Sequence, residues 1–169
     1  MIIGVMSDTH GNSVLMYRVA ELMTADLGVE TILHAGDMYP DGVLLRMSGY
    51  DVRVVPGLGC DEYYDSSIPR RIADVFDGVK ISCVHAEKDL RAAEFSAAII
   101  VTGHTHESRL ERMGRSVYLN PGHLKSEMDR GQRPSFATIV VEPEEVEVTI
   151  HEINGIVRMR EAFRREDIG

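Results

Sequence analysis

The sequence predicts an α/β fold, and two of its patterns lead to that prediction. Between residues 2 and 101, short apolar runs of β-branched character alternate with segments of helical periodicity. From residue 109 onward, the pattern changes to strands separated by turn residues. Continuous apolar strands are typical of sheets that are covered on both faces, so we expect the strands to lie at the centre of the fold.

Strands and helices alternate in the first part of the chain. The predicted strands are short and apolar, and they cover residues 2–7, 31–33, 52–55, 70–76, 79–84 and 99–101. The predicted helices lie between them, at residues 13–25, 43–47 and 89–98. Ser13 is expected to cap the first helix, and Asp77 with Gly78 is a signal for a hairpin turn.

The second part of the chain contains predicted strands alone. We expect a run of antiparallel strands at residues 109–112, 116–119, 136–141 and 146–150. Residues 125–134 are polar and predict a mobile loop. The C-terminal segment 152–169 mixes arginines with glutamates, which predicts a solvated stretch, helical or loose, rather than a phosphate-binding patch.

Length and composition limit the class of protein. A chain of 169 residues is long enough for a real core, and we expect one domain over residues 1–169 with its core in 1–150. The formal net charge of -9 argues against dedicated nucleic-acid binding. No apolar run approaches the roughly 18 residues of a membrane span, and no signal peptide is recognisable. Cys60 and Cys83 lack C-x-x-C spacing, which fits a reducing compartment. Because neither a membrane span nor a signal peptide is recognisable, we expect a cytoplasmic protein without membrane contact.

Residues of metal-binding type follow the predicted strands. His104 and His106 come just after the strand at 99–101. Side chains two residues apart in extended chain project to the same side, so these imidazoles would share one space. Asp8 and His10 repeat that spacing after the first strand. The complete set of candidate metal ligands is Asp8, His10, Asp37, His85, His104 and His106.

Each of these residues also has a purely structural interpretation, as a cap, a turn residue or a satisfied core side chain. That interpretation is the better one for His34, which precedes Asp37 by three residues. The coincidence of six candidates at strand ends favours a metal site instead. Two carboxylates and four imidazoles suffice for two divalent cations if one carboxylate bridges, and mixed nitrogen and oxygen ligands suit Mn, Fe, Co, Ni or Zn.

Several short motifs occur in a fixed order along the chain. They are Asp8-Thr9-His10-Gly11-Asn12, Gly36-Asp37, Gly59-Cys60-Asp61, His85, Gly103-His104-Thr105-His106 and Asn120-Pro121-Gly122. In this order they resemble the calcineurin-like metallophosphoesterase superfamily, specifically its small bacterial and archaeal phosphodiesterases, from Met1 to about Ile150. The resemblance implies a four-layer α/β/β/α sandwich, with two mixed sheets flanked by helices.

The resemblance also implies how the six candidate ligands are shared between two divalent transition-metal ions. One ion would be held by three of them, namely Asp8, His10 and His106. The other would lie on His85 and His104, with Asp37 bridging both ions. Manganese is the first expectation for the metal, with Fe, Ni, Co and Zn as the others.

The third motif departs from the pattern of the family, which has Gly-Asn-Cys-Asp at this place. The chain has Gly57-Leu58-Gly59-Cys60-Asp61 and no asparagine. Either Gly59 replaces the asparagine, or the loop has an insertion after Gly57. In both cases the second ion loses a side-chain ligand, for which water, a backbone carbonyl or a shifted Asp61 would have to substitute.

The candidate catalytic residues are Asn12, Cys60, Asp61 and His104. Asn12 would donate a hydrogen bond to a phosphate oxygen, or it is only a turn residue. Cys60 stands where monoesterase relatives place a histidine that protonates the leaving group. A thiol with a pKa of about 8.5 is a poorer acid there than an imidazolium, so diesters are favoured over monoesters. His123 is a weaker candidate for proton donation, and an exposed loop residue is the simpler interpretation.

These features predict a metal-dependent phosphodiesterase that hydrolyses a small phosphodiester with a metal-bridging hydroxide at a dinuclear site. The alternative is a scaffold or binding module with the same fold, catalytically weak or inactive because the usual asparagine is absent near Gly59. A cysteine enzyme, with Cys60 or Cys83 assisted by His85, would leave the other ligands unexplained. An exposed antiparallel edge would allow two copies to pair, so a homo-oligomer is compatible with the sequence.

Overall fold

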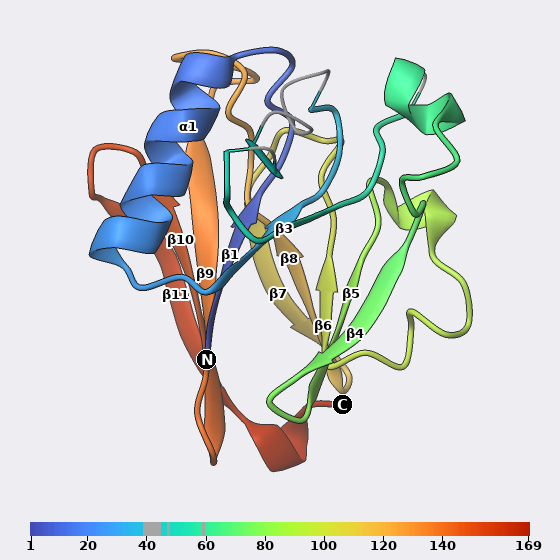
Figure 1. Ribbon diagram of the computed structural model, residues 1–169. Coiled ribbons are helices and arrows are strands. Elements are labelled where there is room, and N and C mark those ends of the chain that lie inside the picture. Colours follow the sequence, from blue (N-terminus) through green and yellow to red (C-terminus); the bar gives the residue numbers. More distant parts are fainter. Residues whose placement is uncertain (39–44, 47, 59) are drawn as a thin grey trace.

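In the part of the chain that the structure describes, two mixed β-sheets lie face to face (Figure 1). The computed structural model describes residues 1–169 except 39–44, 47 and 59. The first sheet has six strands in the order β11-β10-β9-β1-β2-β3, and the second has five in the order β4-β5-β6-β8-β7. The predicted α/β class with two mixed sheets is confirmed.

The strands of each sheet come from separate parts of the chain. The first sheet consists of β1 (Ile2–Met6), β2 (Thr31–His34), β3 (Val52–Val54), β9 (Ser135–Val141), β10 (Glu145–Glu152) and β11 (Val157–Arg164). The second consists of β4 (Ile72–Phe76), β5 (Val79–Cys83), β6 (Ile99–Val101), β7 (Arg109–Met113) and β8 (Ser116–Asn120). The parallel pairs are β1 with β2, β2 with β3, β5 with β6 and β6 with β8.

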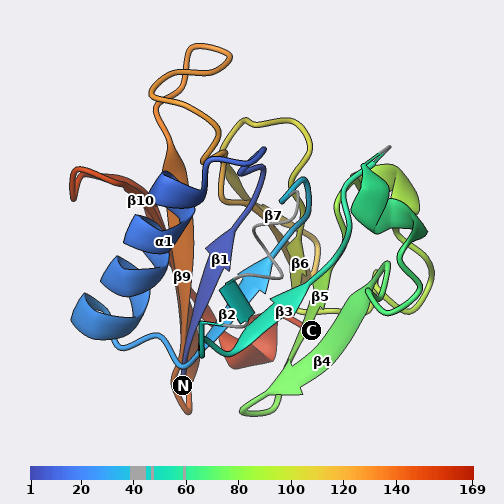
Figure 2. The ribbon, with the colours of Figure 1, turned by 45° about the horizontal axis from the view of Figure 1, so that its top comes forward.

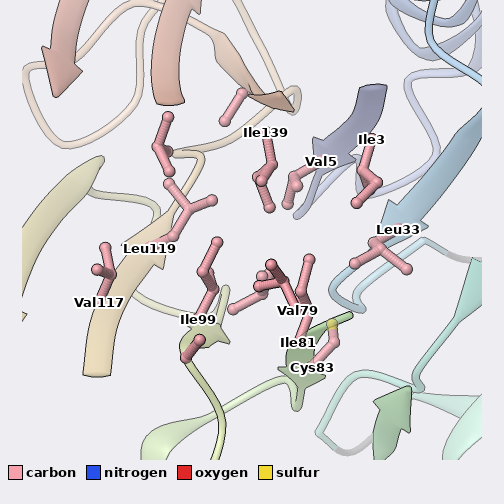
Figure 3. Close-up of a cluster of buried hydrophobic side chains, with 14 of the residues drawn as sticks. Ile3, Val5, Leu33, Val79, Ile81, Cys83, Ile99, Val117, Leu119 and Ile139 are labelled. Carbon is pink, nitrogen blue, oxygen red and sulfur yellow. The ribbon is translucent and has the colours of Figure 1, made fainter. Parts of the chain in front are cut away.

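A hydrophobic core fills the space between the sheets. Ile3 and Val5 of β1 belong to it together with Ile81 of β5 and Ile99 of β6, and all four side chains are fully buried. Figure 3 shows these side chains pointing from the two sheets into a common space. Met6 of β1 packs in a different cluster, because successive residues of a strand face opposite sides of the sheet.

The outer face of the first sheet is covered by α1 (Ser13–Glu21) and the π-helical turn η1 (Leu22–Asp26) that continues it. Figures 1 and 2 show α1 on one flank of the molecule and β4 on the opposite flank. Gly4 allows close packing here, since a Cβ on it would lie 2.7 Å from Met23 Sδ. The predicted cap Ser13 is wrong by one residue, because Asn12 accepts the hydrogen bond from the Leu15 backbone nitrogen at 3.2 Å.

The outer face of the second sheet is covered by turns rather than by an α-helix. The predicted helix over residues 89–98 is wrong, because this region has a 3₁₀ helix, η3 (Glu87–Asp89), followed by turns. Side chains bind the backbone of these turns and compete with helical hydrogen bonding. Lys80 Nζ donates to the Ala93 carbonyl at 2.9 Å, and the Glu94 carboxylate accepts from a backbone nitrogen three residues before it at 2.8 Å. The fourth layer of the sandwich is therefore irregular.

The predicted strands of the second half are confirmed, but they are divided between the sheets. β7 and β8 extend the second sheet, where β8 is parallel to β6, and β9 and β10 join the first. The C-terminal segment is not helical or loose, as the sequence suggested, because β11 pairs antiparallel with β10 and η4 (Arg165–Asp167) follows it. Phe163 and Ile168 are buried in the core between the sheets, which fixes this segment against the domain.

Two further predictions concern turns and helices. The hairpin of β4 and β5 is confirmed, with positive φ at both Asp77 (44°) and Gly78 (81°), as its tight turn requires. Most of the predicted helix at 43–47 lies outside the described residues, of which only 45 and 46 fall in that range and are helical. Among the described residues, no helix is long and apolar enough to cross a membrane.

Candidate metal centre

The six predicted metal ligands come together at one end of the two sheets. They lie in the loops that follow β1, β2, β5 and β6. Their ligand atoms form two groups, in each of which all atoms lie within 4.8 Å of one another. The first group is Asp8, His10, Asp37 and His106, and the second is Asp37, His85 and His104. Asp37 is common to both groups, as expected for a bridging carboxylate.

The backbone at these ligands is strained. Five of the seven non-glycine residues with positive φ in the described chain are predicted ligands: Asp8 (53°), His10 (45°), Asp37 (54°), His104 (68°) and His106 (63°). A non-glycine residue in this region costs about 1–3 kcal/mol, and such strain is concentrated at functional sites. The loops thus hold the side chains in orientations that a relaxed chain would avoid.

Three glycines allow the ligand loops to approach one another closely. A Cβ on Gly57 would lie 1.7 Å from Asp37 Oδ1, and one on Gly103 would lie 2.0 Å from Ser7 Oγ and 2.8 Å from an oxygen of the Asp8 carboxylate. A Cβ on Gly36 would lie 2.5 Å from His85 Nδ1. Any side chain at these positions would displace a ligand, so the glycines are part of the site.

The first group is well ordered by its neighbours. His10 Nε2 lies 3.1 Å from His106 Nε2 and 3.5 Å from Asp37 Oδ2, and His106 Nε2 lies 3.4 Å from Asp8 Oδ1. His106 donates its Nδ1 proton to the Asp129 carboxylate, which leaves the Nε2 lone pair of the neutral ring for a metal ion. The Asp8 carboxylate accepts from Ser7 Oγ at 2.6 Å and from the His104 backbone nitrogen at 3.1 Å.

The second group contains a buried nitrogen without a hydrogen bond. His85 Nδ1 donates to the Ala35 carbonyl at 2.7 Å, so Nε2 of the neutral ring has no proton. This Nε2 is buried without a hydrogen-bond partner and lies 3.5 Å from Asp37 Oδ2. His104 is exposed, and its ring centroid lies 5.1 Å from that of His85. An unpaired imidazole lone pair beside a carboxylate fits a metal ligand.

The protonation states of the site suit metal binding. Burial alone would raise the pKa of Asp37, but the nearby imidazole of His85, the hydrogen bond from Cys60 and the imidazole of His10 lower that pKa to about 2. Burial lowers the pKa of both His10 and His104 from the usual value. At neutral pH the bridging carboxylate is therefore ionised and these two imidazoles are neutral, as coordination requires. The pKa of His106 is raised by the Asp8 and Asp129 carboxylates, and that of His85 is raised by Asp37 against the effect of burial, so an ion competes with a proton at these two ligands.

The predicted catalytic residues of the loops occupy different places. Asn12 caps α1, and its Nδ2 donates to the Lys125 carbonyl at 3.0 Å, so both ends of its amide have partners in the fold. Cys60 Sγ donates to Asp37 Oδ1 at 3.2 Å, and burial together with this bond raises the pKa of the thiol to about 12. Asp61 is exposed at the start of the 3₁₀ helix η2 (Asp61–Tyr64). Gly59, where the sequence leaves the replacement of the asparagine open, lies outside the described residues.

Two further histidines have structural roles. His34 is fully buried, accepts from the Gly36 backbone nitrogen at 3.2 Å, and has a pKa lowered to about 4 by burial. His123 is also buried, so its interpretation as an exposed loop residue is wrong. Its Nε2 donates to the Gln132 carbonyl at 3.1 Å and its Nδ1 accepts from the Lys125 backbone nitrogen at 3.3 Å. Both ring nitrogens of His123 are thus engaged within the fold.

Sequence reasoning missed two residues at this site. Asp129, which binds His106, lies in the segment 125–134 that was predicted only as a mobile loop. Glu62 forms a third group of possible ligands with Asp37 and Cys60. In Figures 1 and 2 the segment that leads into β9 lies at the same end of the molecule as the loop after β1. No local spacing signals either residue, because each meets its partner only through the tertiary fold.

Known proteins share both the sequence pattern and the fold. A family model described as the calcineurin-like phosphoesterase superfamily domain matches residues 1–144. A probable metallophosphoesterase of Methanothermobacter thermautotrophicus is 28% identical over 179 residues, covering 98% of this chain and 100% of the relative. The phosphodiesterase MJ0936 of Methanocaldococcus jannaschii is 27% identical over 139 residues, covering 72% of this chain and 83% of the relative.

A solved structure shares the fold over nearly the whole chain. A conserved uncharacterized protein of Streptococcus pneumoniae TIGR4, described as a predicted phosphoesterase, has a TM-score of 0.73 at 26% sequence identity. The superposition covers 97% of each chain. The region that the family model matches includes all six candidate ligands.

Proposed function

This chain belongs to the calcineurin-like phosphoesterase superfamily and is a phosphoester hydrolase, and from that premise we propose that it is a phosphodiesterase with a dinuclear metal centre. The observation that carries the proposal is the sharing of Asp37 between two groups of ligand atoms. Two divalent cations held by these residues would lower the pKa of a bound water molecule and would neutralise the phosphoryl oxygens of the substrate.

The residues of the first group would hold one ion and those of the second group the other. The unpaired and buried Nε2 of His85 supports this assignment, because a buried polar atom without a partner is rare unless a ligand occupies it. The donor set mixes imidazole nitrogen with carboxylate oxygen, which suits Mn, Fe, Co, Ni and Zn. We take Mn²⁺ as the first ion to test.

The other residues of the site position these ligands. The Asp129 carboxylate and the Ala35 carbonyl each accept the Nδ1 proton of a histidine, which directs the opposite Nε2 of His106 and of His85 into the site. Asn120 Nδ2 donates to the Gly103 carbonyl at 2.8 Å and to Thr105 Oγ1 at 3.1 Å. These bonds fix the loop that carries both His104 and His106.

A cavity beside the metal centre fits a small substrate. Its volume is about 560 Å³, within the range of sites for small molecules, and His104 lies on its wall. The charged residues that line it are Glu87, Lys88, Glu107 and Arg109, and Thr102, Thr105, Ser108 and Asn120 contribute polar groups. The two acidic and two basic side chains balance in charge, and Arg109 pairs with Glu87 at 2.6 Å, so the bound ions would supply the attraction for an anionic ester. We propose a small phosphodiester on the size of the cavity and its position beside His104.

The first experiment measures hydrolysis of bis(4-nitrophenyl) phosphate by metal-stripped protein titrated with Mn²⁺, with 4-nitrophenyl phosphate as the matched monoester. We expect saturable, metal-dependent turnover of the diester and slower turnover of the monoester. Both substrates release 4-nitrophenolate, so the comparison measures the preference for a diester over a monoester and does not depend on protonation of the leaving group. Absence of turnover in protein that has bound both ions would instead favour a scaffold or binding module. Faster monoester turnover would contradict the phosphodiesterase assignment.

Two further features support proposals about the cellular location and the oligomeric state of the protein. Cys60 and Cys83 are free thiols, which fits the reducing conditions of the cytoplasm. β11 is an edge strand of the first sheet and carries the exposed side chains of Val157 and Met159. If the protein forms a homo-oligomer, this edge is where we expect a second copy to pair.

A further inference from the structure

Two buried polar atoms in the described part of the chain have no hydrogen-bond partner, and both belong to residues that cluster with Asp37. They are His85 Nε2 and Glu62 Oε1. Buried side-chain oxygen and nitrogen atoms in folded proteins almost always have a partner, so each exception needs an explanation, and an ion that binds there is one. His85 already has an explanation as a metal ligand. Glu62 has none within the fold.

The position of Glu62 connects it with the second half of the metal centre. Its side chain lies on η2, just after the loop in which Gly57 passes close to Asp37. Ligand atoms of Glu62, Cys60 and Asp37 all lie within 4.8 Å of one another. Asp37 is the residue that this group shares with the other two groups, and Glu62 itself is not grouped with any histidine of the described chain. The Glu62 carboxylate therefore lies close to the bridging carboxylate, from the loop after β3, and its Oε1 has no hydrogen-bond partner among the described residues.

The other polar residues of this loop are less suited to bind a metal ion. The Cys60 thiol uses its proton in the hydrogen bond to Asp37 Oδ1, and a thiol that keeps its proton is not the thiolate form that binds metals. Asp61 is exposed at the first position of η2. Glu62 instead places a second carboxylate beside that of Asp37, and two carboxylate groups side by side favour a cation between them.

We propose that Glu62 is a ligand of the second metal ion, to which it contributes Oε1 beside Asp37, His85 and His104. This inference rests on the dinuclear centre of the proposed function. An anionic oxygen attracts a divalent cation by charge as well as by its lone pair, and it favours harder ions such as Mn²⁺ over softer ones. The chain thus fills the second site with a carboxylate.

The test compares Mn²⁺ binding to the wild type, Glu62→Gln and Glu62→Ala by isothermal titration calorimetry, with Asp65→Asn as a matched control. Asp65 is an exposed acid of the same loop whose Oδ1 accepts from the Ser67 backbone nitrogen, a bond that asparagine retains. We expect both Glu62 variants to lower the affinity for the second ion by at least about 10-fold and to leave the affinity for the first ion unchanged, whereas the control binds both ions as the wild type does.

Thermal unfolding provides a readout that a merely structural role would not produce. Without metal, Glu62→Gln should be as stable as the wild type or more so, because the amide has the shape of the carboxylate and Oε1 has no hydrogen bond for the change to break. With saturating Mn²⁺, the same variant should gain less stability than the wild type, because it binds the second ion less tightly. Loss of stability in the metal-free variant, with unchanged Mn²⁺ binding, would assign Glu62 a structural role and overturn the proposal.

Cobalt substitution separates Glu62 from Cys60 as the ligand. We expect the Co²⁺ protein to show no thiolate-to-cobalt charge-transfer band, and Cys60→Ser to bind two ions. A charge-transfer band that Cys60→Ser abolishes would make Cys60 the ligand and overturn the proposal. Wild-type protein that binds fewer than two ions would contradict the dinuclear centre itself, whereas two ions in the wild type and unchanged binding in Glu62→Gln would contradict only the role of Glu62.

Discussion

In the first half of the site, Asp8 and His106 are fixed by hydrogen bonds to other side chains of the fold. In the second half, by contrast, the His104 ring is exposed, and two buried atoms, His85 Nε2 and Glu62 Oε1, have no hydrogen bond in the described part of the chain. The first half is therefore ordered before any ion binds, and the second half depends on the ion for part of its order. Preordered ligands lose less conformational entropy on binding. We expect the first ion to bind more tightly than the second.

Asp37→Ala tests the element that the two halves share, and it should have the largest effect. Removing the common carboxylate weakens both ions, and the loss of several kcal/mol of stabilisation by metal corresponds to a fall in kcat/KM of about 10³-fold or more. Steady-state hydrolysis of the diester and metal content by atomic emission measure this effect, and circular dichroism checks the fold. Unchanged turnover would show that Asp37 does not bridge two ions.

His104→Ala and His10→Ala separate the two halves. His104 belongs to the second group and is exposed, so its removal should leave one ion bound and lower kcat about 10²-fold without loss of stability. His10→Ala should weaken the first ion instead. Metal titrations of both variants measure these affinities. Equal loss of both ions in each variant would show that the two halves are not separate sites.

A decrease in pH should destabilise the contact between the loop that carries Asp37 and the first half of the site. His34 accepts from the Gly36 backbone nitrogen and lies 3.3 Å from Thr9 Oγ1, so it joins the loop after β2 to the loop after β1. Its pKa is lowered by burial from 6.5 to about 4, so the unfolded chain takes up this proton more readily than the folded protein. Stability present at pH 7 is therefore lost as the pH falls from 6.5 towards 4, by roughly 3 kcal/mol in total.

Urea unfolding at pH 7 and pH 5 measures this loss, with His34→Asn as the comparison. The asparagine Oδ1 can take the place of Nδ1 as acceptor for Gly36, but it does not titrate in this range. We expect the variant to be less sensitive to pH than the wild type. The same pH sensitivity in both proteins would assign the loss of stability to other groups.

The features that the sequence predicted correctly are local ones. His104 and His106, like Asp8 and His10, follow apolar strands directly, so strand periodicity and spacing placed them at strand ends without knowledge of the sheet order. The hairpin turn at Asp77 was equally visible, because its signal lies within neighbouring residues. These predictions needed no contact between distant segments.

The features that the sequence missed depend on contacts between distant segments. Asp129 meets His106 from 23 positions away, and Glu62 meets Asp37 from a loop whose spacing differs from the family motif. The segment 89–98 has helical composition, but its side chains bind turns instead. β11 resembles a solvated tail because it is an edge strand, with most of its side chains exposed.

Asp129→Asn tests why the first half is ordered. Asparagine can still accept from His106 Nδ1 but carries no charge, so the imidazole becomes a weaker donor to the metal ion. We expect the first ion to bind about 10- to 100-fold more weakly and the second ion to bind as before. Calorimetric titration with Mn²⁺ distinguishes the two ions. A change in the second ion alone would reverse the assignment of Asp129.

Arg158→Lys changes a residue of β11 that supports the first half, and it should have the smallest effect on metal binding. The guanidinium of Arg158 donates to Ser108 Oγ at 2.9 Å, to Gln132 Oε1 at 3.2 Å and to the Arg133 carbonyl at 2.9 Å. These bonds hold the segment that contains Asp129 against β11, the edge strand. Lysine keeps the charge but cannot make these bonds in several directions at once.

The expected result is a loss of about 3-fold in affinity for the first ion, since the carboxylate is held less firmly while its own bond to His106 remains. Arg160→Lys is the matched control, because Arg160 lies on the same strand, is exposed and pairs with Glu147 at 2.7 Å. The second ion should bind equally well in both variants. If Arg158→Lys weakened both ions alike, β11 would stabilise the domain as a whole and would not selectively order the first half of the metal centre.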